Sequence, residues 1–151
     1  MKLGELLHET RVSLALDASD KEGALRELAA LLTGGDPALS ATAVFDVLAA
    51  REELASTGVG SGVAIPHGRV AGLEEIRAAL AVHRGGVDFE AIDGEKVHVL
   101  VAILAPEDRL SQHLKVLAEV SRALRKKDVR RALREAATPR DAIAALAGPG
   151  G

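Results

Sequence analysis

A single histidine, His67, stands where a short apolar run meets a proline and a glycine, in the stretch 65–68, Ile-Pro-His-Gly. Proline fixes its own φ, lacks a backbone N–H and favours an extended conformation in the residue before it. The glycine on the other side allows conformations that a Cβ would penalise and lets another molecule approach closely. These properties predict that His67 lies at the end of a strand, rigidly held and open to a partner. The triplet alone is also typical of an ordinary turn.

Nucleophilic catalysis is the chemistry that fits such a histidine, because neutral imidazole is nucleophilic and mostly uncharged near neutral pH. A histidine that accepts a phosphoryl group needs access for the donor, a fixed ring and hydrogen-bond donors for the arriving oxygens. The setting of His67 offers the first two, so the third must come from elsewhere in the chain.

Two residues are candidates for that third role. His113 follows Leu110 by three positions and precedes Leu117 by four in a predicted helix, on or beside its apolar stripe. A histidine there is most often a satisfied residue at the edge of the core. Arg51 lies near the end of another predicted helix, where arginine commonly complements the helix dipole. Its planar guanidinium would also suit phosphate oxygens, so the residues alone leave both interpretations open.

Nucleotide and metal sites fit the sequence poorly. The glycines at 58, 60 and 62 do not form G-x-G-x-x-G, because Val63 occupies the third glycine's place, and no Gly-Lys-Ser/Thr follows. The histidines form no close ligand pair and HExxH is absent. With no cysteine, thiolate metal sites, disulfides and cysteine nucleophiles are excluded. We therefore expect neither a metal nor another cofactor.

The elements that must position these residues alternate between strand and helix patterns, which predicts an α/β fold with helices over a mixed sheet. The nearly continuous apolar run from Val97 to Leu104 predicts a central strand covered on both faces. Further strands are predicted over 11–16, 63–65 and 76–83, the last closed by Arg84-Gly85-Gly86. Helices are predicted over 24–32, from Ser40 to Leu54, from Pro106 to Leu124, and near 128–136 and 139–147. The buried stripes are predicted to be Val44, Val47, Leu48 and Leu54, and then Leu110, Leu114, Leu117, Val120 and Leu124.

Composition narrows the class of protein. The chain is 48% hydrophobic and 27% charged, which is typical of a globular domain, and its core must be aliphatic because it has two phenylalanines and no tyrosine or tryptophan. A net charge of −3 argues against nucleic acid as a partner. No apolar stretch is long enough to insert into a membrane and the N-terminus is unlike a secretory signal, so a cytoplasmic protein is expected. One domain over 1–147 and a disordered tail over 148–151 are predicted.

Taken together, the stretch 54–68, Leu-Ala-Ser-Thr-Gly-Val-Gly-Ser-Gly-Val-Ala-Ile-Pro-His-Gly, closely resembles the active-site signature of type-2 enzyme IIA domains. These belong to the fructose/mannitol class of the bacterial phosphoenolpyruvate-dependent phosphotransferase system (PTS), which also includes nitrogen-regulatory IIA proteins. Later blocks resemble the family in the same order, at 89–94 (Phe-Glu-Ala-Ile-Asp-Gly), 104–107 (Leu-Ala-Pro-Glu) and 112–114 (Gln-His-Leu). The resemblance covers essentially the whole chain and implies the mannitol-type IIA fold, a single-domain three-layer sandwich.

By position, the resemblance implies that His67 is the phosphorylated histidine, that His113 is a second active-site histidine, and that Arg51 is the family's active-site arginine. It implies a phosphoryl donor of the HPr type and an acceptor that is either a sugar-specific IIB domain or a regulatory target. No nucleotide or metal is required by that scheme.

The sequence leaves two roles open. We predict a transport relay that hands the phosphoryl group to a sugar-specific IIB domain of the fructose/mannitol class, and the alternative is a nitrogen-regulatory protein that controls partners through the phosphorylation state of His67. Gly68-Arg69 and the block at 89–94 look slightly more like the nitrogen-regulatory branch. His83 and His98 are interpreted as structural or solvated. The cations at 122, 125, 126, 127, 130, 131 and 134 are interpreted as a solvated helix face, or else as a basic patch for an acidic partner.

Overall fold

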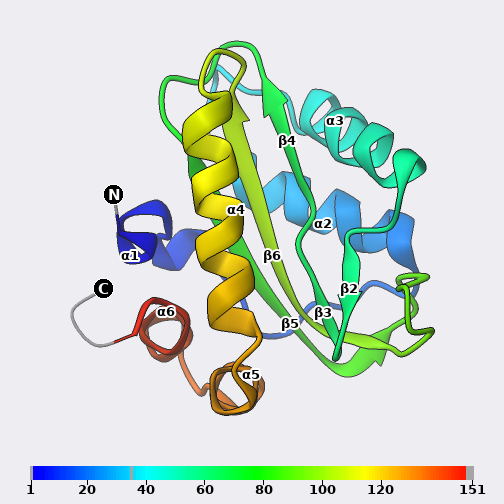
Figure 1. The fold of residues 1–151 in the computed structure, drawn as a ribbon. Coiled ribbons are helices and arrows are strands. Elements are labelled where there is room, and N and C mark those ends of the chain that lie inside the picture. Colours follow the sequence, from blue (N-terminus) through cyan, green and yellow to red (C-terminus); the bar gives the residue numbers. More distant parts are fainter. Residues whose placement is uncertain (1, 35, 149–151) are drawn as a thin grey trace.

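The computed structural model describes residues 2–34 and 36–148, and within them six strands form one mixed sheet (Figure 1). Their order across the sheet is β1-β5-β6-β3-β2, and β4 also pairs with β6. The strands are β1 Val12–Ser13, β2 Gly58–Gly60, β3 Val63–Ala64, β4 His67–Val70, β5 Arg77–Val87 and β6 Val97–Pro106.

The apolar strand β6 lies at the centre, as the sequence predicts. It pairs antiparallel with β5 on one edge and parallel with both β3 and β4 on the other. Pro66 separates β3 from β4, and its carbonyl accepts a hydrogen bond from the Ile103 N–H at 2.9 Å. The strand that leads to His67 is therefore fixed along the most deeply buried strand of the molecule.

Helices cover both faces of the sheet, which gives the expected three layers (Figure 1). On one face, α2 (Lys21–Thr33) and α3 (Ala41–Leu54) pack their apolar sides on the strands. On the other lie α1 (Leu3–Leu6), α4 (Leu110–Leu124), α5 (Lys127–Glu135) and α6 (Pro139–Ala147). Side-chain caps begin several of these helices, for example Ser40 Oγ, which accepts from the Ala43 N–H at 3.2 Å.

Several predicted boundaries were wrong. The first strand is only β1, because a 3₁₀ turn occupies Glu9–Arg11. Strand β5 continues through the two glycines to Val87, and the glycine-rich stretch itself contains β2. Helix α4 begins at Leu110 rather than at Pro106, which ends β6.

The predicted apolar stripes were wrong at the positions nearest the site. Leu54 is 82% exposed at the last turn of α3, and Leu110 and Leu114 are 49% and 56% exposed. The inward positions of α4 belong to His113, Val116, Val120 and Leu124 instead. A histidine thus takes the buried position that the pattern assigns to leucine.

Gly148, the first residue of the predicted tail, is the C-cap of α6, and residues 149–151 lie outside the described part of the chain. The division into a domain and a disordered tail stays a prediction. Across the described ranges, no helix has the length and apolar character needed to cross a membrane.

Candidate functional site

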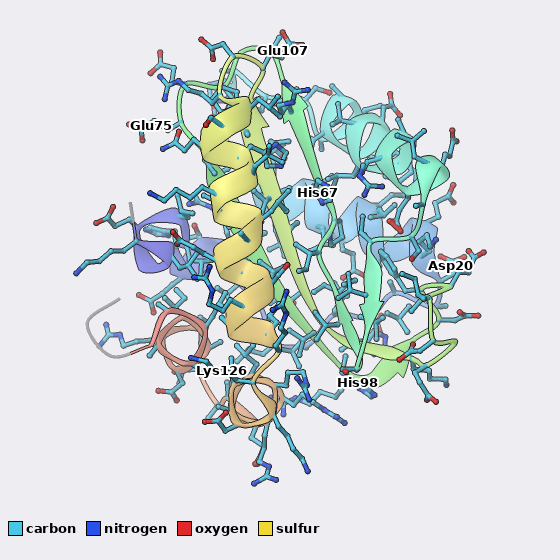
Figure 2. The ribbon with its side chains drawn as sticks, viewed as in Figure 1. Asp20, His67, Glu75, His98, Glu107 and Lys126 are labelled. Carbon is cyan, nitrogen blue, oxygen red and sulfur yellow. The ribbon has the colours of Figure 1, made fainter. Side chains whose placement is uncertain are left out.

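His67 is the first residue of β4, directly after the break at Pro66. It was expected at the end of a strand and instead begins one, opposite Ile103 of β6. Figure 2 shows it between α4 and α3, the helices that carry the other two candidate residues. The fold therefore brings His67, His113 and Arg51 together from three separate elements.

The hydrogen bonds of His67 assign its tautomer. Nδ1 lies 2.7 Å from the carbonyl oxygen of Ile65, which can only accept, so Nδ1 carries the proton and donates. Nε2 then keeps its lone pair, and it accepts a hydrogen bond from Nε of Arg51 at 3.2 Å. The ring is oriented by its own chain two residues back, and Nε2 is the ring nitrogen that carries the lone pair.

Arg51 is fixed by the end of its own helix. Its Nη1 donates to the carbonyl oxygen of Ala55 at 3.0 Å, where the chain turns away from α3 into an extended conformation. This bond satisfies a carbonyl that the helix leaves unpaired and directs the guanidinium toward His67. Donors remain on the guanidinium for a further acceptor beside Nε2.

His113 lies across from His67, with ring centroids 5.5 Å apart and the ring planes at 75°. It is 4% exposed, and neither of its ring nitrogens has a hydrogen-bond partner in the described part of the chain. Burial, then the neighbouring His67, then Arg69 lower the pKa of His113 to about 4. A buried, neutral imidazole whose two nitrogens lack partners there costs the folded state free energy, and it can donate a hydrogen bond to a group that arrives beside it.

The pKa of His67 is also lowered, chiefly because burial penalises the charged ring. The hydrogen bond to Ile65 acts in the opposite direction, Arg51 lowers the pKa further, and Glu52 raises it. Both histidines are therefore neutral near pH 7, which leaves the lone pair on Nε2 of His67 available for attack.

Glu52 is a site residue that the sequence reasoning missed. Although it is a helical carboxylate next to Arg51, it is buried and accepts two bonds from the Thr57 N–H, at 2.8 and 2.9 Å, and one from Thr57 Oγ1 at 2.7 Å. Lys21 Nζ lies 3.5 Å from it. The carbonyl of Thr57 in turn accepts from the Ile65 N–H at 2.9 Å, so Glu52 braces the residue that orients His67.

Arg69 was also missed as a site residue. It follows His67 by two positions on β4, which places both side chains on the same face of the strand. Its Nη1 donates to the carbonyl of Glu107 at 3.1 Å, in the turn before α4. The period-two spacing was a signal that could have identified it.

The role of Gly68 differs from the expected one. Its φ is not in the left-handed region, so no unusual conformation requires glycine there. A Cβ at this position would overlap Cγ1 of Val47 on α3. The close approach comes from inside the molecule, where α3 packs directly on the strand that carries His67.

The remaining histidines of the strands are held by backbone groups. Nε2 of His83 lies 2.8 Å from the carbonyl of Ala18, and Nδ1 of His98 lies 3.0 Å from the carbonyl of His83. Over residues 2–34 and 36–148, no group of three or more histidine, aspartate or glutamate residues is arranged to hold a metal ion.

Comparison with known families matches residues 5–148 to the model described as phosphoenolpyruvate-dependent sugar phosphotransferase system, EIIA 2. A nitrogen regulatory protein of Bradyrhizobium diazoefficiens is 42% identical over 137 residues, which cover 89% of this chain and 87% of the relative. A PTS fructose-specific EIIA component of Haloferax volcanii is 36% identical over 125 residues, 83% of this chain and 81% of the relative.

Solved structures agree with this assignment of the fold. The nitrogen regulatory protein IIA-Ntr of Neisseria meningitidis superposes with a TM-score of 0.88 at 35% identity, over 95% of this chain and 98% of that one. Mannitol IIA of Escherichia coli superposes with a TM-score of 0.77 at 23% identity, over 93% and 99% of the two chains. The predicted three-layer fold of the mannitol IIA type is confirmed.

Proposed function

Because the chain belongs to the EIIA type-2 family of the phosphotransferase system, we propose that it is a phosphocarrier that accepts a phosphoryl group on Nε2 of His67 from a phosphorylated HPr-type protein. The observation that carries the proposal is the tautomer of His67. Nδ1–H is committed to the carbonyl of Ile65, so the lone pair of Nε2 faces the guanidinium of Arg51.

The proposed step exchanges one P–N bond for another. The lone pair of Nε2 forms a bond to phosphorus while the bond from phosphorus to the donor's histidine breaks and its electron pair returns to that ring. His67 keeps its Nδ1 proton throughout, since the hydrogen bond to Ile65 does not have to change. With a phosphohistidine on each side, the transfer is close to balanced and reversible, and the protein mainly positions groups and screens charge.

Arg51 and His113 supply donors to the phosphoryl oxygens in this proposal. Arg51 must give up its 3.2 Å bond to Nε2 when that atom is phosphorylated, and its N–H groups then turn to the oxygens. His113 would donate from a ring nitrogen that has no partner in the described residues before phosphorylation. The cost of these unsatisfied groups falls when the phosphoryl group arrives, which favours acceptance.

Downstream, a regulatory role is favoured by the similarity to nitrogen regulatory proteins, at 42% identity for one relative and 35% for one solved structure. In that role, partners would distinguish the phosphorylated from the unphosphorylated form of His67. Transfer to a sugar-specific IIB domain is the second candidate, supported by the 36% identity to a fructose-specific EIIA component. Either role places the protein in the cytoplasm.

Intact-mass spectrometry after incubation with phosphoenolpyruvate, enzyme I and HPr tests the relay chemistry. We expect one acid-labile phosphoryl group on the wild type and on His8→Ala, which removes an exposed histidine, but none on His67→Ala. Full labelling of His67→Ala at the wild-type rate would contradict the proposal.

A chase experiment separates the two downstream roles. The phosphorylated protein is mixed with a fructose-specific IIB domain, and loss of its label is followed over time. Rapid transfer to IIB supports the sugar relay. A stable label supports the regulatory role if other proteins also bind only the phosphorylated or only the unphosphorylated form of this protein.

A further inference from the structure

A cavity of about 590 Å³ lies apart from the three candidate site residues, none of which lines it. Its walls come from the turn between β2 and β3 at Ser61 and Gly62, from β5 around Val82 and Arg84, and from α5. Figure 2 shows long side chains with terminal nitrogens projecting around α5, where Lys126 is labelled. The volume is in the range of small-molecule sites, which run from about 300 to 1,000 Å³.

The wall contributed by α5 is mainly cationic. Lys127, Arg130, Arg131 and Arg134 line the cavity and are spaced i, i+3, i+4 and i+7, so they share one face of the helix. Leu133, on a different face, is fully buried in the core. The segregation of the two faces directs four positive charges toward one concave surface.

These charges are not neutralised within the described part of the chain. No ion pair there joins any of the four cations to a carboxylate, and Glu135 is the one acid among the residues that line the cavity. Like charges three and four positions apart on a helix are destabilising, and four such pairs occur among these cations, whereas the acids of α5, Asp128 and Glu135, lie at that spacing only from Arg131. The whole chain carries a net charge of −3, so this concentration of cations is a local feature.

Two arginines are already oriented at the cavity. Arg84 donates to the carbonyls of Arg134 and Ala136 at 2.9 and 3.0 Å, across the end of α5. Arg130 donates to the carbonyls of Leu124 and Arg125 at 2.9 and 2.7 Å, across the end of α4. Because each guanidinium has further N–H groups, these bonds hold the side chains in place without using all their donors.

We propose that this cavity binds a small molecule that carries two or more phosphate groups. Guanidinium groups match phosphate oxygens in geometry, and held guanidinium groups lose less entropy on binding. A compact polyanion would also relieve the repulsion along α5. The buried Val82 and Val99 give the cavity an apolar wall against which an organic part of such a ligand can pack.

Isothermal titration calorimetry with inorganic pyrophosphate, ADP and orthophosphate tests this proposal on the full chain. The test variant is Arg131→Ala/Arg134→Ala, because both residues are exposed and their side chains make no hydrogen bond or ion pair within the described residues. The matched control is Arg122→Ala, which removes an exposed cation outside the cavity. Circular dichroism checks that each variant is folded.

We expect pyrophosphate and ADP to bind the wild type more tightly than orthophosphate, and the double variant to lose about tenfold or more in affinity. Arg122→Ala should change the affinity less than about twofold. Tighter binding of ADP than of pyrophosphate would assign a role to the apolar wall.

Three results would overturn the proposal: no heat with pyrophosphate or ADP, equal binding by the double variant, or equal losses in Arg122→Ala. Binding of an oligoglutamate peptide without pyrophosphate binding would also overturn it and point to an acidic protein segment. None of these readouts depends on phosphorylation of His67, so they are independent of the proposed relay.

Discussion

The segment from Ser61 to His67 connects the candidate site at His67 with the basic cavity, and the two regions differ in how much charge they carry. At one end, His67 and His113 are kept neutral by burial, and Arg51 is hydrogen-bonded to Nε2 of His67. At the other end, Ser61 and Gly62 border a cavity where arginine and lysine side chains gather with little acid beside them.

The difference follows from what each region would have to do with phosphate. A relay site must release the phosphoryl group, and strong binding of the phosphorylated state would slow onward transfer. At the relay site one of the two proposed donors, the His113 imidazole, is neutral, so the transferring group meets less fixed positive charge than a set of guanidinium groups would supply. A site that only binds a polyanion has no such restriction, so full cations can accumulate there.

The largest effect on stability is expected at Glu52, the buried carboxylate that holds Thr57 beside the candidate site. Glu52→Ala leaves the buried N–H and hydroxyl of Thr57 without their acceptor and removes the ion pair with Lys21. We expect a loss of about 3–5 kcal/mol in the free energy of unfolding, measured by urea denaturation. Glu53→Ala, which truncates the exposed neighbour, should change it by less than about 0.5 kcal/mol. Similar losses in both variants would show that Glu52 has no bracing role.

The neutral state of His113 can be tested by pH. Its pKa is about 4 in the folded protein and about 6.5 when unfolded, so the unfolded chain binds the proton first as the pH falls. Stability is therefore greatest above pH 6.5 and declines toward pH 4, by up to about 3 kcal/mol from this one residue. Urea denaturation at several pH values should show a flatter decline for His113→Leu than for the wild type. Parallel curves would contradict the burial of a neutral ring.

The central strand of the sheet was predictable because β6 is apolar at nearly every position. Such a continuous apolar run is typical of a strand that is covered on both faces. The grouping of His67, His113 and Arg51 was predictable from the family resemblance rather than from periodicity, and the structure brings the three together. Periodicity assigned Leu114 to the core, although it is exposed and His113 is buried.

Other features depend on tertiary packing that local patterns do not carry. A glutamate near a helix end is usually solvated, so nothing local marks Glu52 as buried against Thr57. The cations of α5 are recognisable as a helix face, and they are largely exposed as expected. That this face borders a cavity depends on how α5 lies against β5 and the β2–β3 turn, which no single segment specifies.

The packing of α3 on β4, the strand that begins at His67, can be disrupted at Gly68. Gly68→Ala places a Cβ onto Cγ1 of Val47, so Val47 must move, and we expect α3 with Arg51 to shift away from His67. We expect a loss of about 2 kcal/mol in the free energy of unfolding and slower labelling of His67. In Val47→Ala/Gly68→Ala the overlapping methyl is gone, and the labelling rate should recover. A double variant that labels as slowly as Gly68→Ala would mean that glycine is needed there for another reason.

The smallest effect on stability is expected at the basic cavity, and there the substitution should stabilise the protein rather than destabilise it. Lys127→Glu replaces one of the cations of α5 by an anion that lies three positions before Arg130 and four before Arg131, so repulsion becomes attraction. In low salt, the free protein should gain about 0.5 kcal/mol in stability, measured by urea denaturation. The same variant should bind pyrophosphate more weakly and keep normal labelling of His67. Arg122→Glu is the control for net charge. A loss of stability in Lys127→Glu would mean that the cations of α5 stabilise the free protein, and the contrast between the two regions would then lack its physical basis.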